Sequence, residues 1–207
     1  MQTLDDLLNG YRRFRSGNYQ RDGELYEKLG TGQSPKVLVI GCADSRVDPG
    51  DIFNAGPGEL FVVRNVANLV PPYGSGDDLD GVSAALEYAV TALKVEHIVI
   101  MGHASCGGVG ASLAANEGNP YGQFVAPWVK LLDGARDKVL SAGSDNPQLA
   151  LEHAGISASI ENLMTFPFVS DAVSAGELNL HGAWFNIGKG ELHWRDADTG
   201  VFAPVAA

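Results

Sequence analysis

Two stretches of this sequence decide the fold that we expect, and the first is Val37-Leu38-Val39-Ile40-Gly41 followed by Cys42-Ala43-Asp44-Ser45-Arg46. The second is Ile98-Val99-Ile100-Met101-Gly102 followed by His103-Ala104-Ser105-Cys106-Gly107-Gly108. Short runs of branched apolar residues are typical of strands that are buried on both faces of a parallel sheet. Because ligands bind beyond the carboxyl ends of the strands in open α/β sheets, we expect the residues after the two runs to meet at one point.

Three of these residues, Cys42, His103 and Cys106, have the side chains of a zinc site. Thiolate sulfur and imidazole nitrogen suit zinc better than the hard cations, which prefer oxygen ligands. Three such ligands with a free fourth position are the arrangement of a catalytic zinc, whereas a structural site adds a fourth Cys or His, and the chain has only 2 cysteines. The alternative is a pair of buried structural cysteines and a surface histidine. Asp44 and Arg46, beside the first cysteine, favour the zinc site.

The length and composition indicate one globular domain. The chain has 207 residues, of which 45% are hydrophobic and 19% are charged, which is enough for one sizeable core. We expect a single domain over 1–207, with an N-terminal helical arm at 1–30 and an α/β core at 31–207. The net charge of −11 argues against nucleic acids and anionic membranes as partners. No N-terminal signal or long apolar run is apparent, and two cysteines suit a reducing compartment, so we expect a cytoplasmic protein.

The N-terminal segment is predicted to be a helix. Thr3 can cap a helix that runs through about Ser16 and ends at Gly17. Its apolar residues recur at helical spacing: Leu4, Leu7, Leu8, Tyr11 and Phe14. Because this apolar stripe precedes the core sheet, we expect it to pack on something other than that sheet.

The rest of the chain alternates between strand and helix patterns, which predicts an α/β fold with a mostly parallel central sheet of four to five strands flanked by helices. Leu60–Arg64 is a further apolar strand, and 178–187 and 191–195 are predicted to pair around a glycine-rich turn. A long helix is expected to begin at Asp77 or Asp78. Residues 121–165 are expected to be helical, with a break near 143–147.

The two motifs together resemble those of the β-class carbonic anhydrases. That family carries C-x-D-x-R on one strand end and H-x-x-C on another, in this order and about this far apart, as at 42–46 and 103–106. Between them lies Arg64-Asn65-Val66-Ala67-Asn68, which also matches, and the strong part of the resemblance covers roughly 32–110. The resemblance implies a lyase with one Zn²⁺ per chain that hydrates carbon dioxide reversibly to bicarbonate and a proton. It also implies a homodimer or homotetramer, with the N-terminal helix packed on a partner subunit.

The resemblance further implies a role for each residue of the metal site. Cys42, His103 and Cys106 would hold the zinc. An ionised Asp44 can only accept hydrogen bonds, so it would accept one from the nucleophile and leave a lone pair directed at the substrate. Arg46 would hold Asp44 ionised through a bidentate pair. The alternative for the last two residues is a plain surface ion pair.

Four residues match the substrate pocket of the family: Gln33, Phe61, Val66 and Tyr88. The resemblance places Gln33 across the dimer interface. Gln33 would donate its amide to a substrate oxygen, although a polar turn residue is the alternative. The other three would form the apolar wall that a small apolar substrate needs, and they could equally be ordinary core residues. The histidines outside the motifs are more often structural or exposed than ligands: His97, His153, His181 and His193.

Two other functions and one regulatory question stay open. The same metal ligands would serve a hydrolase of carbonyl sulfide or carbon disulfide, or a non-enzymatic zinc or thiol sensor. Some bacterial members of the family carry a second bicarbonate site made of Trp, Arg and Tyr, and here the corresponding positions are Val39, Arg64 and Phe185. Because the first and last offer an anion no donor, we expect an open active site in which Asp44 stays paired with Arg46.

Overall fold

The computed structural model describes residues 3–75, 80–118 and 121–206, and the chain divides into two compact units, 1–34 and 35–207. The first unit is helical, with α1 (Leu4–Ser16), α2 (Asn18–Arg21) and α3 (Gly23–Leu29). Thr3 caps α1 through a reciprocal pair of hydrogen bonds with Asp6, and the helix ends at Gly17, as expected. Three leucines of α1 are exposed: Leu4 by 72%, Leu7 by 57% and Leu8 by 46%. The packing of α1 on a partner subunit stays a prediction.

The second unit is built on a six-stranded sheet in the order β2-β1-β3-β4-β5-β6. The strands are β1 (Val37–Cys42), β2 (Leu60–Asn65), β3 (His97–His103), β4 (Asn179–Asn186), β5 (Glu191–Arg195) and β6 (Phe202–Pro204). The neighbouring pairs from β2 to β4 are parallel, and β5 and β6 add antiparallel pairs. The mostly parallel sheet is confirmed. The strand beyond the expected number is β6, which is too short for a visible alternation of apolar and polar residues.

The helices of this unit connect and cover the strands. They are α4 (Pro49–Ile52), η1 (Val66–Asn68), α5 (Gly81–Glu87), η2 (Tyr88–Leu93), α6 (Gly107–Asn116), α7 (Val125–Val129), η3 (Lys130–Leu132), α8 (Asp133–Ser141), α9 (Pro147–Leu163) and α10 (Pro167–Ser174). Asp77 and Asp78, expected to open the helix before β3, lie outside the described residues. The cap of α5 is Asp80, whose carboxylate accepts the backbone N–H groups of Val82 and Ser83. Among the described residues, no helix is both long and apolar enough to cross a lipid bilayer.

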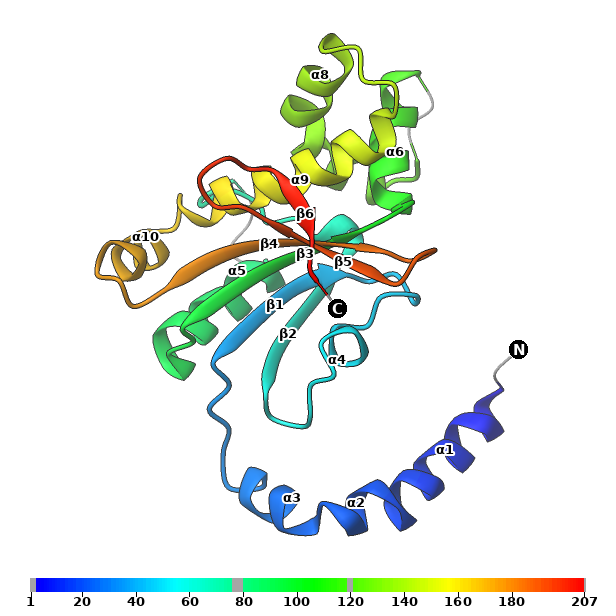
Figure 1. Ribbon diagram of the computed structural model, residues 1–207, viewed down its shortest axis with the longest axis vertical. Coiled ribbons are helices and arrows are strands. Elements are labelled where there is room, and N and C mark those ends of the chain that lie inside the picture. Colours follow the sequence, from blue (N-terminus) through cyan, green and yellow to red (C-terminus); the bar gives the residue numbers. More distant parts are fainter. Residues whose placement is uncertain (1–2, 76–79, 119–120, 207) are drawn as a thin grey trace. The chain divides into compact units, whose positions relative to one another are not determined.

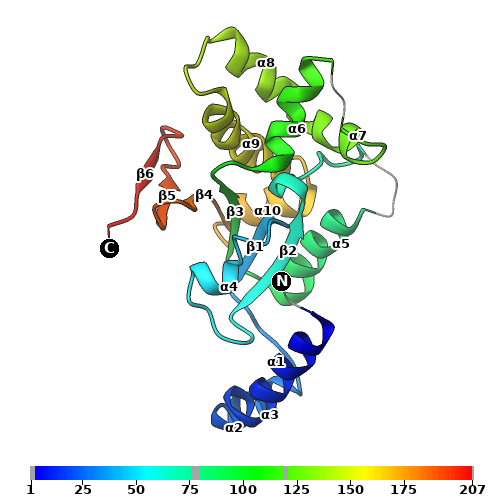
Figure 2. The same ribbon diagram turned by 90° about the vertical axis from the view of Figure 1, so that its right-hand side faces the viewer.

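The core lies on both faces of the sheet, as the apolar runs of β1 and β3 predict. Leu38 and Ile40 of β1 belong to one buried cluster with residues of α5, α9 and α10, whereas Val39 belongs to a second cluster with Val99 and Met101 of β3. Figure 2 shows α5 and α10 on one side of these strands and α4 on the other. In Figure 1, α6 continues from the carboxyl end of β3 and lies near α8 and α9.

A glycine allows α6 to approach the turn that follows β2. A Cβ atom added at Gly108 would lie 2.7 Å from Cγ1 of Val66 and 2.9 Å from Cβ of Ala67, which is closer than van der Waals contact allows. Ala67 has a φ of 64°, in the left-handed region, so its backbone has little freedom to retreat. The beginning of α6 is therefore set against η1 by the absence of a side chain.

We expect Gly108→Ala to lower the free energy of unfolding by about 1–3 kcal/mol, because the added methyl group overpacks this contact. Gly107→Ala is the matched control, since no heavy atom lies within 4 Å of its added Cβ. The control should leave the stability unchanged or slightly higher. Urea denaturation of both variants, with and without zinc, measures the difference. Equal midpoints for the two variants would show that the close approach is not required.

The strand β6 packs on a half-buried histidine of α9. The ring of His153 is stacked on Phe202, with centroids 4.1 Å apart, and meets Trp184 edge to face at 5.1 Å. Burial, with a smaller contribution from the charge of His193, lowers the pKa of His153 to about 4. The folded protein therefore keeps this imidazole neutral in mild acid.

We expect His153→Phe to reduce the acid sensitivity of the fold. Above the unfolded-state pKa near 6.5, His153 is neutral in both the folded and the unfolded state. Its packing then contributes fully to the free energy of unfolding. As the pH falls from there toward the folded-state pKa of about 4, only the unfolded chain binds the proton, so stability is lost. Between pH 7 and pH 5 the wild type should lose about 1–2 kcal/mol more than the variant. Urea midpoints at the two pH values test this, and parallel losses would contradict it.

Candidate metal centre

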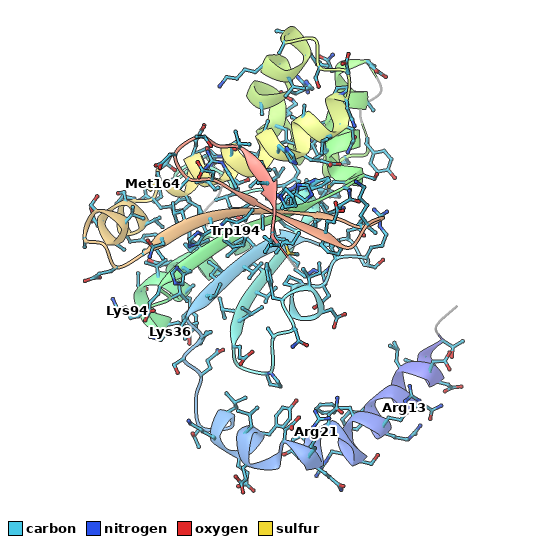
Figure 3. All side chains as sticks on the ribbon, viewed as in Figure 1. Arg13, Arg21, Lys36, Lys94, Met164 and Trp194 are labelled. Atoms are coloured by element: carbon cyan, nitrogen blue, oxygen red, sulfur yellow. The ribbon has the colours of Figure 1, made fainter. Side chains whose placement is uncertain are left out.

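The carboxyl ends of two neighbouring parallel strands bring the expected ligands together. Cys42 is the last residue of β1 and His103 the last residue of β3, and these strands pair with Gly41 beside Met101. Cys106 follows at the start of α6. The ligand atoms of Cys42, His103 and Cys106 all lie within 4.8 Å of one another, and the three residues are buried. Lys36 and Lys94, labelled in Figure 3, precede β1 and β3 and mark the opposite end of these strands.

The distance between the two sulfur atoms fits a zinc ion. Sγ of Cys42 and Sγ of Cys106 are 3.9 Å apart, and both cysteines are free. A disulfide would bring them to about 2.05 Å. Two thiolates on one tetrahedral zinc, each at about 2.3 Å from the ion, are about 3.8 Å apart. The pair is therefore arranged as ligands rather than as a disulfide.

The ring of His103 has one nitrogen engaged and one free. Nδ1 lies 3.0 Å from the carbonyl oxygen of Ala104, to which it can donate. Nε2 is buried and has no hydrogen-bond partner among the described residues. A buried polar atom without a partner is costly, and metal-bound histidines commonly donate their other N–H to a backbone carbonyl. The orphaned Nε2 therefore fits a metal ligand.

The two thiols perturb each other. The hydrogen bond from Cys106 lowers the pKa of the Cys42 thiol to about 4. The same hydrogen bond, and then burial, raise the pKa of the Cys106 thiol, while the N–H groups of Gly108 and Val109 at the start of α6 act in the opposite direction. The pair thus shares a proton, and a coordinated divalent cation is what would hold both sulfurs as thiolates.

Asp44 lies at the edge of this cluster and is paired with Arg46. Nε and Nη2 of Arg46 donate to the two carboxylate oxygens of Asp44 at 2.9 and 2.7 Å, and the Arg46 backbone N–H donates to Oδ1 at 3.0 Å. The hydrogen bonds from Arg46 hold the pKa of Asp44 well below its usual range, against the effect of burial. Oδ2 of Asp44 is 3.9 Å from Nε2 of His103. An ionised acceptor therefore borders the ligand atoms, in the expected pairing.

Arg64 is a residue whose part in this site the sequence did not reveal. Its guanidinium donates to the carbonyl oxygens of Cys42 at 2.9 Å and Asp44 at 2.6 Å, and to the carboxylate of Asp48 at 2.9 Å. The same side chain thus ties together the backbone on both sides of Ala43. The sequence placed Arg64 in a matching motif and at the arginine position of a second bicarbonate site, but neither signal indicated these contacts.

The four expected substrate residues are not all at the cluster. Val66 touches the start of α6 near Gly108, close to Cys106. Phe61 and Tyr88 contact each other, with ring centroids 5.9 Å apart, but Phe61 pairs with Leu38 whereas Asn65 pairs with Cys42. Four residues of strand place Phe61 about 13 Å along the sheet from the metal ligand in the same chain. Gln33 belongs to the first unit and is exposed. The substrate roles of these residues stay predictions.

The chain is similar to carbonic anhydrases in sequence and in structure. The family model described as Carbonic anhydrase matches residues 37–192. Beta carbonic anhydrase 5, chloroplastic, of Arabidopsis thaliana is 38% identical over 188 residues, which cover 89% of this chain but only 62% of that relative's length. The solved structure of the β-carbonic anhydrase CcaA matches with a TM-score of 0.92 and 33% identity, over 98% of this chain and 99% of that one. A structure from the study of two tetrameric β-carbonic anhydrases of Sordaria macrospora matches with a TM-score of 0.80 and 29% identity. The match covers 98% of this chain and 100% of that one.

Proposed function

Since the chain belongs to the β-class carbonic anhydrase family, we propose that it catalyses the reversible hydration of carbon dioxide to bicarbonate and a proton. The observation that carries this proposal is the buried cluster of Cys42, His103 and Cys106, with an ionised Asp44 at its edge. The sulfur and imidazole atoms of the family motif lie within 4.8 Å of one another, which supports this proposal.

We assign one Zn²⁺ per chain to the two sulfurs and to Nε2 of His103. When bound, zinc acidifies a coordinated water and so supplies the nucleophile, which is the established effect of this metal in carbonic anhydrases. Oδ2 of Asp44 accepts a hydrogen bond from the attacking oxygen. This contact turns a lone pair of the attacking oxygen toward the substrate carbon. Arg46 holds the carboxylate ionised and in one orientation through its two-pronged contact. Arg64 fixes the backbone carbonyls on either side, so this orientation is set before substrate arrives.

We further propose that a second copy of the chain completes the substrate pocket. Val66 lies near the cluster of its own chain, whereas Phe61 and Tyr88 lie far along the strand from Cys42. Phe61, Tyr88 and Gln33 would therefore serve the site of a partner, in a dimer or tetramer. The exposed leucines of α1 are an apolar surface of the kind that such a partner covers. A cytoplasmic location stays part of the proposal.

The test is the rate of carbon dioxide hydration by purified protein of measured zinc content and measured mass. We expect activity in proportion to zinc. Faster release of sulfide from carbonyl sulfide or carbon disulfide, with little hydration of carbon dioxide, would instead indicate a hydrolase. A folded, zinc-loaded protein with neither activity would reject catalysis and leave a zinc or thiol sensor.

A further inference from the structure

A buried carboxylate, Glu152 of α9, lies behind the metal ligands and is not used by the proposed reaction. The residue is 3% exposed. Its Oε1 accepts the backbone N–H of Cys106 at 3.0 Å and the amide of Gln148 at 2.7 Å, and its Oε2 accepts the indole N–H of Trp184 at 3.0 Å. None of the ion pairs among the described residues includes it. Three N–H donors suit an ionised carboxylate, which only accepts hydrogen bonds.

Glu152 and Gln148, one turn apart on α9, hold both main-chain polar groups of Cys106. Glu152 accepts its N–H, and the amide of Gln148 donates to its carbonyl oxygen at 3.0 Å. Cys106 begins α6 without any side-chain cap of its own, since its sulfur is directed to the cluster. The preceding residue, Ser105, has a φ of 56°, a left-handed conformation that is unfavourable for a residue with a Cβ. Contacts from outside the turn are therefore needed to keep Cys106 in this position.

The second carboxylate oxygen of Glu152, Oε2, is held by the indole of Trp184, which packs against other aromatic rings. Trp184 of β4 lies between two imidazoles, those of His153 and His193, each with its centroid 5.1 Å from that of the indole and close to perpendicular to it. Trp184 also pairs with Gly102, next to His103, in the register of β4 with β3. The carboxylate is thus fixed between β4, the neighbour of the strand that carries His103, and the helix start that carries Cys106.

We propose that Glu152 is a positioning residue for the metal: its hydrogen bond to the Cys106 N–H sets the place of the Cys106 sulfur, and this raises the affinity of the site for zinc. The proposal rests on the assigned metal site but is independent of the substrate. Residues that orient metal ligands in this way typically change metal affinity or activity by about 10–100-fold when they are replaced.

The decisive variants are Glu152→Gln, Trp184→Phe and the double variant. Glutamine has the size of glutamate but presents an NH₂ group at one end. In Glu152→Gln that group must face either the Cys106 N–H together with the Gln148 amide, or the Trp184 N–H, and facing donors repel. Trp184→Phe removes the second donor, so in the double variant the glutamine oxygen can turn to Cys106 without conflict. Glu161→Gln is the matched control, an exposed glutamate on the same helix.

The primary measurement is the zinc dissociation constant by competition with a chromogenic chelator, with folding checked by circular dichroism. We expect Glu152→Gln to weaken zinc binding by about 10–100-fold, the control to match the wild type, and the double variant to bind more tightly than Glu152→Gln. The second measurement is the thiolate-to-cobalt absorption band of Co²⁺-loaded protein, which should shift in Glu152→Gln and return in the double variant. A residue that only stabilised the fold would lower the melting temperature without moving this band in folded protein.

Wild-type zinc affinity in folded Glu152→Gln would overturn the proposal, as would a double variant that binds no more tightly than Glu152→Gln. If Glu152→Gln does not fold, Glu152→Asp gives the same decision, because its shorter side chain keeps the carboxylate but draws it back from the Cys106 N–H. Weaker zinc binding by folded Glu152→Asp would support the proposal, and wild-type affinity would reject it. A wild-type protein that binds no zinc at all would instead reject the assigned metal site.

Discussion

Cys106→Ser is expected to abolish stable zinc binding, and Cys42→Ser is expected to do the same. Each variant replaces a thiolate, one of three buried ligand atoms within 4.8 Å of one another, by a hydroxyl that stays protonated. Structural zinc sites with four ligands bind by roughly 12 kcal/mol, or about 3 kcal/mol per ligand, so one lost thiolate should weaken binding by about a hundredfold or more. Activity should fall in proportion to the zinc that is lost.

Elemental analysis after dialysis against a weak chelator measures this effect. The chain has only 2 cysteines, so no other thiol can substitute for the one removed. Ser45→Ala is a suitable control, because Ser45 is exposed in the loop that follows Cys42 and offers no ligand to the cluster. Full zinc occupancy in either cysteine variant would show that the assigned ligand set is wrong.

Asp44→Ala is expected to keep its zinc and to lose about a hundredfold or more in turnover. The carboxylate contacts Arg46 through both oxygens and lies 3.9 Å from Nε2 of His103 through Oδ2, so it borders the ligand atoms without joining them. Removing one preorganised group that orients the reacting atoms typically costs on the order of 3 kcal/mol in the transition state. Because the pKa of Asp44 is held low by Arg46, the role of the ionised carboxylate should persist through mildly acidic pH.

Stopped-flow measurement of carbon dioxide hydration, paired with zinc analysis of the same sample, separates the two possible roles of Asp44. Asp51→Ala is the control, since Asp51 is an exposed carboxylate on the adjacent helix α4. Wild-type turnover in Asp44→Ala would remove Asp44 from the mechanism. Loss of zinc together with activity would mean that Asp44 is itself a ligand.

The clustering of the three candidate ligands was largely predictable because its determinants are local. Each ligand follows an apolar run that is long enough to be recognised as a buried strand, and parallel strands present their carboxyl ends at the same edge. Cys42 and His103 are the last residues of these two strands, so the pairing of the strands is enough to bring them together. The pairing of Asp44 with Arg46 is equally local, since only one residue separates them.

The residues that hold the ligands in place were not predictable in the same way. Arg64, Gln148 and Glu152 act on the backbone of Cys42 and Cys106 through hydrogen bonds that join distant parts of the chain. Nothing in the sequence near Glu152 distinguishes it from an ordinary exposed glutamate of an amphipathic helix. Its burial follows from the packing of α9 on β3 and β4, and only that packing gives it three donors.

By itself, the sequence determined the α/β class, the parallel strands and the candidate ligand residues that come together, because apolar periodicity and side-chain chemistry are properties of short segments. Only the tertiary structure decided that β6 extends the sheet and that Phe61 lies far along its strand from Cys42. It also decided that a buried carboxylate stands behind Cys106. These features depend on register, close approach and the pairing of buried polar groups, which are settled when segments far apart in the chain pack together.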